Sequence, residues 1–246
     1  MKQQNKQLTH LKWPCMILLN LLACSLYAQT KPENSIISTK RVLLQYKNQR
    51  DTLWIPVVPD KYPALKKALA YQKLFDGDNL NAVIKNYDTC GCGVTGLRYA
   101  VTFEGKGIIS IKIYVDYYGA YPNSYEKWYT LETATGKVYP VTRELNSAGL
   151  NWVLQNYKAI LRKRIATEKQ ENDTEDTATW NTLKADIADL KRAELLGKYV
   201  FTKEGIQFST EAALGHAVHL FEPYRDWLIP YDRLTKFKAP GAAILK

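Results

Sequence analysis

The sequence predicts an α+β fold, an antiparallel sheet meander packed with helices. The main support is a run in which Ile109, Ile111, Ile113 and Val115 alternate with polar residues. A period of two is typical of a half-buried strand. Segments with helical spacing lie between groups of strands rather than alternating regularly with them, which favours α+β over a parallel α/β sheet.

A turn follows this strand and leads into a second one. Residues 119–124 (GAYPNS) are turn formers, and β-rich residues resume at 128–132. Another turn is expected at Thr135 and Gly136, before Val138. Successive strands joined by short turns predict an antiparallel meander.

Upstream of the meander, residues 29–107 are expected to form a smaller α+β subdomain. Runs at 41–46 and 51–58 predict a hairpin, and residues 97–103 predict the strand that enters the meander. Polar residues around these runs supply the expected turns.

Two short helices are expected between these strands. The first covers 60–70, with Asp60 as its cap and Pro63 in its first turn. Asp78 is expected to cap the second helix. Each assignment rests on a capping residue placed just before apolar residues with helical spacing.

Residues 108–246 are expected to form the C-terminal α+β domain. An amphipathic helix is predicted beyond Ser147, and residues 168–176 should be a solvated connection, partly helical at most. A second helix is expected to end at Gly197. Further strands are expected at 198–202, 206–208 and 227–231, and residues 238–243 should be a tail.

Residues 1–28 are expected to be a secretory signal peptide. A lysine-containing start precedes an apolar run at 15–27, and Ala28 is a small residue at the cleavage point. The run is shorter than the roughly 20 residues of a membrane-spanning helix, so no transmembrane span is expected in the mature chain. We therefore expect a periplasmic or secreted protein. An alternative is an outer-envelope lipoprotein with a lipid anchor at Cys24, because residues 21–24 also resemble a lipoprotein signal.

The chain is basic, with a formal net charge of +10 at pH 7. Removal of residues 1–28, which contain three lysines and no acidic residue, lowers this charge to +7. A basic exported protein is attracted to anionic envelope surfaces, although plain solubility explains the charge equally well. No nucleic-acid partner is expected, because the compartment is wrong and no recognition motif occurs.

Two cysteines, Cys90 and Cys92, remain after ordinary cleavage of the signal peptide. A local disulfide is the favoured interpretation in an oxidising compartment. A structural zinc site normally takes four ligands, and the chain has no second cysteine pair. A redox couple normally has the spacing Cys-x-x-Cys, whereas only one residue separates Cys90 from Cys92.

The order of motifs resembles the extracellular domain shared by RsiV-type anti-sigma factors and PdaC-type peptidoglycan deacetylases. The residues that carry the resemblance are YGAYPN at 118–123, TATGK at 133–137, the strand at 201–208 and IPYDRL at 229–234. The resemblance covers roughly residues 97–235 and implies a sensory or binding module without an effector domain.

One departure from the family pattern and one charge argument limit what the resemblance carries over. Tyr121 stands where the family has a histidine, so no role of that imidazole is transferred. Some members bind lysozyme, but a mature chain of charge +7 would repel the usual cationic lysozymes.

Tyrosines gather around the predicted turn, and alternation places some of them in the core. Those that face outward are suited to stacking on sugar rings or to anchoring a protein. The candidate binding residues are Tyr118, Tyr121, Asn123 and Tyr125.

The alternative site is a metal centre. His216 and His219, with Glu222 beyond them, could supply three ligands of a catalytic zinc ion. The more ordinary interpretation is that these histidines are surface or hydrogen-bonded residues.

The sequence thus predicts an exported, non-enzymatic binding module without a cofactor. Its expected partner is a cell-wall glycan or an envelope or extracellular protein. The alternative is an exported metal-dependent hydrolase that acts on envelope polysaccharide.

Overall fold

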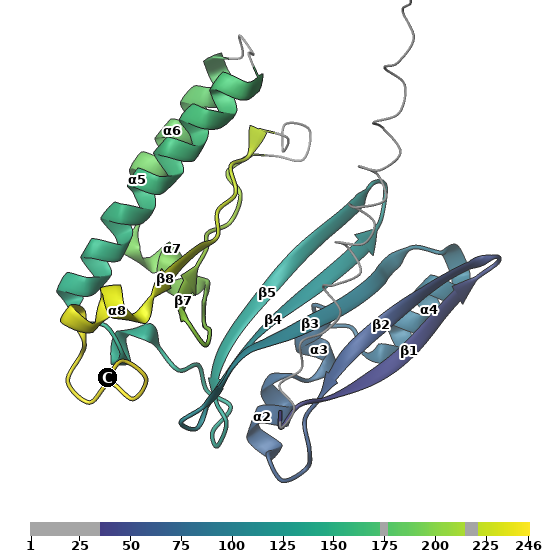
Figure 1. Cartoon of the computed structure of the whole chain (residues 1–246). Helices are drawn as coiled ribbons and strands as arrows, with labels where there is room; N and C mark the ends of the chain where they lie inside the picture. The colour runs from purple at the N-terminus through teal and green to yellow at the C-terminus, as the bar shows by residue number, and fades with distance from the viewer. Residues whose placement is uncertain (1–34, 173–176, 215–220) are drawn as a thin grey trace, which may run out of the picture.

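The computed structural model describes residues 35–172, 177–214 and 221–246. It contains a five-stranded sheet in the order β1-β2-β3-β4-β5 and a three-stranded sheet in the order β6-β7-β8 (Figure 1). Helices pack against both sheets, so the predicted α+β class is confirmed. The expected signal peptide and Cys24 lie outside the described residues.

The larger sheet begins with the predicted hairpin. Strand β1 (Ser38–Tyr46) pairs antiparallel with β2 (Gln49–Val57). Lys47 has a positive φ of 51°, which lets the chain reverse over two residues. Strand β3 (Gly93–Gly105) lies parallel to β2, joined by the single pair Leu53 and Leu97.

The predicted meander is confirmed by three long antiparallel strands. Strand β3 pairs with β4 (Ile108–Tyr118), which pairs with β5 (Pro122–Glu132). The turn after β4 is shorter than expected, because β5 already begins at Pro122.

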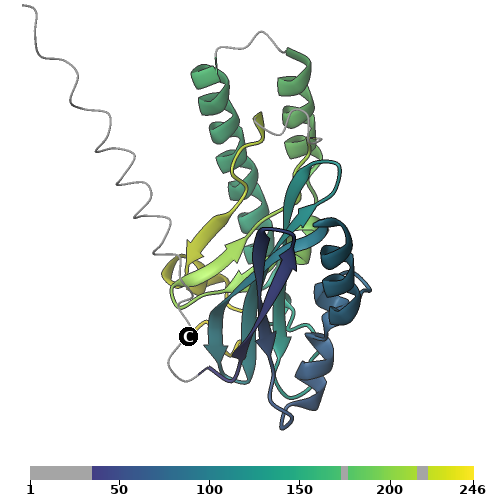
Figure 2. The same cartoon turned by 90° about the vertical axis from the view of Figure 1, so that its right-hand side faces the viewer.

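Three short helices cover one face of this sheet. They are α2 (Pro63–Ala68), α3 (Tyr71–Leu74) and α4 (Leu80–Cys90). Figure 2 shows them on one side of the sheet, with the smaller sheet on the other side. Their apolar residues form one core with β1 to β5.

Neither expected helix cap is observed. The carboxylate of Asp60 instead pairs with Lys66 at 2.6 Å. Asn79, rather than Asp78, caps α4 by accepting the backbone N–H of Ala82 at 2.9 Å. Asparagine and aspartate accept this bond equally well, so composition alone cannot fix a cap to one of two adjacent residues.

Strand β4 is buried on both faces, whereas the sequence predicted a half-buried strand. Ile111 and Ile113 pack on the helical side, and Ser110 and Lys112 are also buried. Ser110 Oγ accepts the backbone N–H of Phe201 at 3.1 Å, so the smaller sheet covers the polar face.

The second half of the chain forms a separate core. Helix α5 (Ser147–Asn172) lies beside α6 (Thr177–Asp189), and α7 (Arg192–Gly197) follows (Figure 1). The smaller sheet contains β6 (Tyr199–Phe201), β7 (Gly205–Phe208) and β8 (Trp227–Pro230). Helix α8 (Tyr231–Leu234) and the 3₁₀ turns Val141–Arg143 and Thr235–Phe237 complete the described elements.

Several boundaries in this half differ from the expected ones. Helix α5 continues to Asn172, into the expected connection. The helix expected to run to Gly197 is broken between α6 and α7. The expected tail is held in place, because the buried carboxylate of Glu144 accepts the backbone N–H groups of residues 243–245.

The expected domain boundary after residue 107 falls in the turn between two paired strands, β3 and β4. The apolar face of β4 completes the core of the first half, while Ile108 belongs to the second core. In the part of the chain that the structure describes, we find no helix with the length and apolarity to span a membrane.

Candidate binding site

A pocket of about 460 Å³ opens at the tyrosine-rich turn. Strand β2 contributes Gln49 and Asp51 to its wall, and β3 contributes Thr95. Residues 116–118 of β4 and 122–124 of β5 complete it. The turn selected from the sequence is therefore one wall of a hollow rather than an isolated loop.

The pairing of the strands explains why a hollow forms here. Strands β2 and β3 share only the pair Leu53 and Leu97, so the start of β2 is not hydrogen-bonded to β3. The pairing of β3 with β4 shifts register between Val94 and Gly96, which leaves Thr95 as the extra residue. Such bulges bend a strand and often occur next to binding sites.

Two of the four predicted binding residues line the pocket, namely Tyr118 and Asn123. Tyr118 is about half exposed, at 48%. Tyr121 lies at the turn and is 72% exposed, but it is not part of the pocket wall.

Tyr125, the fourth predicted residue, lies further along β5 and has a structural contact. Its hydroxyl donates a hydrogen bond to Asp76 at 2.8 Å, and Lys127 donates to the same carboxylate at 2.5 Å. Burial and the bond to Asp76 raise the pKa of Tyr125 above its usual value. The hydrogen bond from Lys127 lowers the pKa of Asp76. Tyr125 thus ties the sheet to the segment after α3.

The pocket also contains polar residues that sequence reasoning missed. Asp51 and Asp116 each bring a carboxylate, Gln49 an amide and Tyr117 a second exposed ring. Asp51 is remote in sequence from the turn, and only the pairing of β2 with β3 brings it there. Asp116 and Tyr117 directly precede Tyr118 in the sequence. This closeness to a predicted binding residue could have identified them as candidates.

Asp51 is held in place by two donors. Gln49 Nε2 donates to Asp51 Oδ2 at 2.9 Å, and the hydroxyl of Tyr87 on α4 donates to the same oxygen. Tyr87 is fully buried. Burial, followed by the bond to Asp51, raises the pKa of Tyr87. The buried Tyr87 of α4 therefore orients one carboxylate of the pocket.

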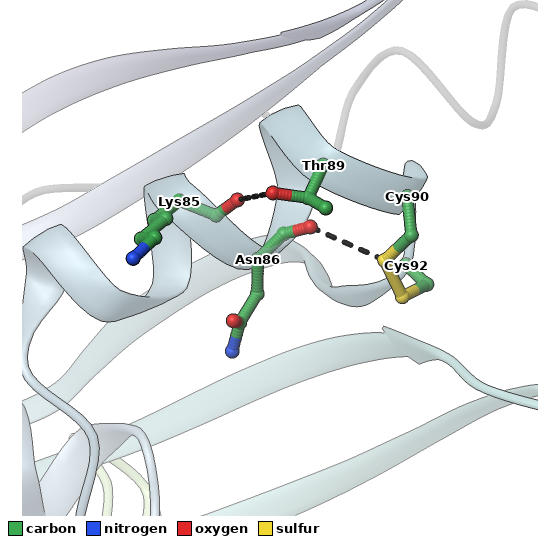
Figure 3. The surroundings of a disulfide bond; sticks show 5 residues. All are labelled: Lys85, Asn86, Thr89, Cys90 and Cys92. Atoms are coloured by element: carbon green, nitrogen blue, oxygen red, sulfur yellow. Dashed lines mark hydrogen bonds between the residues drawn. A yellow bond between two sulfur atoms is a disulfide. The ribbon is translucent and has the colours of Figure 1, made fainter.

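A disulfide joins Cys90 and Cys92 at the end of the same helix (Figure 3). Between them, Gly91 ends α4 with a left-handed φ of 64°. A Cβ atom added to Gly91 would lie 2.4 Å from the ring of Tyr46 in β1. Glycine thus allows the disulfide turn to lie directly against the β1–β2 hairpin.

One hydrogen bond and one sulfur–oxygen contact of the last turn of α4 are also visible in Figure 3. Thr89 Oγ1 donates to the carbonyl oxygen of Lys85 at 2.8 Å, and Cys90 Sγ lies 3.2 Å from the carbonyl oxygen of Asn86. The backbone N–H of Gly91 donates to the carbonyl oxygen of Tyr87 at 2.7 Å, so the disulfide turn is hydrogen-bonded to the residue whose hydroxyl bonds Asp51.

The alternative metal site includes one described residue, Glu222. Its carboxylate accepts hydrogen bonds from Arg225 Nε and, at 3.1 Å, from the backbone N–H of Leu214. His216 and His219 lie outside the described residues. Among the residues that the structure does describe, no cluster of three His, Cys, Asp or Glu side chains is arranged for a metal ion.

Fold and pocket together define an α+β protein with a mixed aromatic and polar hollow at one end of its larger sheet. No protein-family model and no curated protein matches the chain. A solved structure from Pseudomonas aeruginosa, described as a DUF3298 family protein, is similar in fold. The two are 16% identical, with a TM-score of 0.50, over 85% of this chain and 97% of that chain.

A DUF3298 family member from Bacteroides fragilis is 11% identical, with a TM-score of 0.42, over 82% of this chain and 92% of that chain. DUF3298 denotes a domain of unknown function. The likeness to the Pseudomonas protein concerns the fold, and the resemblance to RsiV-type domains stays a prediction from motif order.

Proposed function

We propose that the protein is an exported, non-enzymatic binding module, similar to the RsiV-type extracellular domain, that recognises a cell-envelope glycan in the pocket beside the tyrosine-rich turn. The protein would be periplasmic or secreted. The alternative is an outer-envelope lipoprotein that is anchored through a lipid on Cys24. Recognition is by binding alone, and the pocket residues hold the ligand without transforming it.

The observation that carries the proposal is the composition of the pocket wall. Two exposed aromatic rings, Tyr117 and Tyr118, line the same hollow as the planar polar groups of Gln49, Asp51 and Asn123. Aromatic rings offer apolar faces to the C–H groups of a sugar. Carboxylates and amides supply the acceptors and donors that fix hydroxyl groups in orientation.

The shape of the site favours a glycan over a protein as the ligand. Protein interfaces bury roughly 800 Å² on each partner and require broad complementary surfaces. The site is a pocket of about 460 Å³ between four strands, within the range typical of small-ligand sites. One or two sugar rings are an appropriate occupant for such a volume.

Binding of the purified protein to insoluble peptidoglycan and to soluble envelope oligosaccharides tests the proposal. We expect Tyr118→Ala and Asn123→Ala to weaken binding at least about tenfold, as truncation of a central contact residue does. Tyr121→Ala should retain binding, since Tyr121 does not line the pocket. Circular dichroism and the melting temperature show whether each variant is folded.

Tyr224→Ala is the matched control, because Tyr224 is 67% exposed and does not line the pocket. Retention of wild-type affinity by folded Tyr118→Ala and Asn123→Ala would exclude the pocket as the site. Capture of an envelope protein with no glycan bound would replace the glycan by a protein ligand. Either result overturns the proposal.

A further inference from the structure

The pocket is locally acidic in a basic protein. The whole chain has 34 lysines and arginines against 24 acidic residues. The pocket wall nevertheless contains two carboxylates, Asp51 and Asp116, and none of its described lining residues is a lysine or arginine. The charge of the pocket wall is thus opposite in sign to that of the whole chain, and this bears on which ligand fits there.

The carboxylate of Asp51 keeps one oxygen available. Gln49 and Tyr87 both donate to Oδ2, and Oδ1 accepts no hydrogen bond from the described residues. An oriented carboxylate with an open acceptor is suited to a charged donor, because hydrogen bonds between ionised groups are shorter and stronger than neutral ones.

The second carboxylate, that of Asp116, lies over the backbone of β3 at Gly96. A Cβ atom added to Gly96 would come within 2.5 Å of Asp116 Oδ2, so glycine makes room for this carboxylate. Arg98 Nη2 contacts both carboxylate oxygens, at 3.4 and 3.3 Å. These are long contacts from a largely exposed side chain, and such surface pairs are weak.

The charge balance therefore stays negative where a ligand would lie. Arg98 offsets at most one of the two carboxylates and does not itself line the pocket. The rings of Tyr117 and Tyr118 add faces that attract a cation. A ligand bearing an ammonium group complements this surface, whereas phosphate or carboxylate groups are repelled.

We infer that the pocket selects an amine-bearing sugar, in which a free amino group is protonated, over the same sugar with the amine acetylated. This inference rests on the proposed function, because it names the glycan class that the proposed site takes. Acetylation removes the positive charge and adds bulk, and both changes disfavour a site built around two carboxylates.

Paired oligosaccharides test this directly. Isothermal titration of the purified protein would compare a β-1,4-linked glucosamine oligomer with the N-acetylglucosamine oligomer of equal length, at a pH where the free amine is protonated. We expect the glucosamine oligomer to bind about tenfold more tightly. The net positive charge of the protein opposes this preference, so bulk electrostatics cannot produce it.

Charge-neutralising variants attribute the preference to the pocket. Asp51→Asn should lower affinity for the glucosamine oligomer about tenfold and leave the acetylated oligomer nearly unaffected. Asp116→Asn should act in the same direction. Asp60→Asn is the control, because its carboxylate is exposed, pairs with Lys66 and does not line the pocket.

Failure of this inference is distinguishable from failure of the proposed function. Equal or tighter binding of the acetylated oligomer overturns the amine preference, as does complete lack of binding by the glucosamine oligomer. The proposed function still stands if peptidoglycan binding is lost in Tyr118→Ala. It fails separately if that variant binds peptidoglycan as the wild type does.

Discussion

The buried hydroxyl of Tyr87 donates a hydrogen bond to the carboxylate of Asp51, which joins the inward face of helix α4 to the wall of the pocket. The contact links a core residue of the first half of the chain to a carboxylate that is a candidate ligand-binding group. Any change that moves the end of α4 should therefore change the pocket.

Tyr87→Phe removes this hydrogen bond with little change in packing. We expect the unfolding free energy to fall by about 1.5–3 kcal/mol, the range for a hydrogen bond to a charged acceptor. Ligand affinity should fall as well, because Asp51 keeps only the donor Gln49. Urea unfolding and titration measure the two effects. Tyr46→Phe, whose hydroxyl makes no hydrogen bond to the described residues, is the control and should preserve both quantities.

Replacing both Cys90 and Cys92 by serine tests the role of the disulfide. The closed loop is very short, so the chain-entropy model predicts a loss of about 1–2 kcal/mol of stability. Reducing agent should lower the melting temperature of the wild type by a similar extent and leave the double variant unchanged. An identical response of both proteins to the reductant would contradict a structural role for this bond.

Glu144→Gln tests how the C-terminal segment is held. The buried carboxylate accepts the hydroxyl of Tyr139 at 2.5 Å and the backbone N–H groups of residues 243–245 at 2.9–3.0 Å. An amide has one acceptor oxygen, and its NH₂ group would face backbone donors. We expect a loss of about 3 kcal/mol in urea unfolding.

Deletion of residues 243–246 should cost a comparable amount of stability, because it removes the backbone N–H groups that donate to Glu144. The control is Glu132→Gln, which alters a partly exposed ion pair with Arg143. It should change stability little. Equal stability of Glu144→Gln and the wild type would show that the segment is held by apolar contacts alone.

Local pattern predicted the strands and helices well, because their periods are properties of adjacent residues. The alternation around Ile111 located β4, and helical spacing located α5. The pattern could not show that β4 is covered on both faces. Ser110 Oγ of β4 accepts the backbone N–H of Phe201 at 3.1 Å, so the covering strand comes from a segment remote in sequence.

The candidate site was predictable only in part, for a related reason. Tyr118 and Asn123 belong to a turn whose composition marks it in the sequence. Asp51 lies in the same pocket because β2 pairs with β3 at Leu53 and Leu97. This pairing joins segments remote in sequence, so no local sequence pattern predicts it. Tyr125 has the same residue type as Tyr118, but its hydroxyl is bonded to Asp76, a contact invisible to composition.

A buried ion pair between the two sheets gives a further prediction. Lys112 Nζ lies 3.3 Å from Asp226 Oδ2, with side-chain exposures of 7% and 16%. Burial lowers the pKa of Lys112, and Asp226 opposes this shift. Lys112→Met should cost about 1–3 kcal/mol, because Asp226 keeps Gln207 as a donor but loses its counter-charge.

The double variant Lys112→Met with Asp226→Asn should recover part of that loss, since no unpaired charge remains. Urea unfolding of the two single variants and the double variant gives the coupling energy. The exposed pair Lys66 with Asp60 provides the control, and Lys66→Met should change stability little. Strictly additive effects at Lys112 and Asp226 would argue against coupling.

Buried tyrosines should make the protein lose stability at alkaline pH. Burial raises the pKa of Tyr157 and of Tyr199 to about 12 in the folded protein. In the unfolded chain, tyrosine ionises near pH 10. A raised folded pKa means that the stabilisation is complete below pH 10 and is lost as the pH rises from 10 to 12.

Each such tyrosine should lower unfolding free energy by about 1.4 kcal/mol per pH unit within that window. Urea unfolding at pH 8, 10 and 11 measures the slope. Tyr199→Phe should be less stable at pH 8, because Tyr199 donates to the carbonyl oxygen of Tyr139 and accepts the N–H of Val141. Its slope above pH 10 should nevertheless be shallower than that of the wild type.

Tyr118→Phe, which removes an exposed hydroxyl, is the control and should keep the wild-type slope. The comparison of slopes separates ionisation from packing, because a lost hydrogen bond shifts stability equally at every pH below 10. An unchanged slope in Tyr199→Phe would mean that this hydroxyl ionises with the solvent-exposed tyrosines, and that the contact between β6 and the segment before α5 opens readily at high pH.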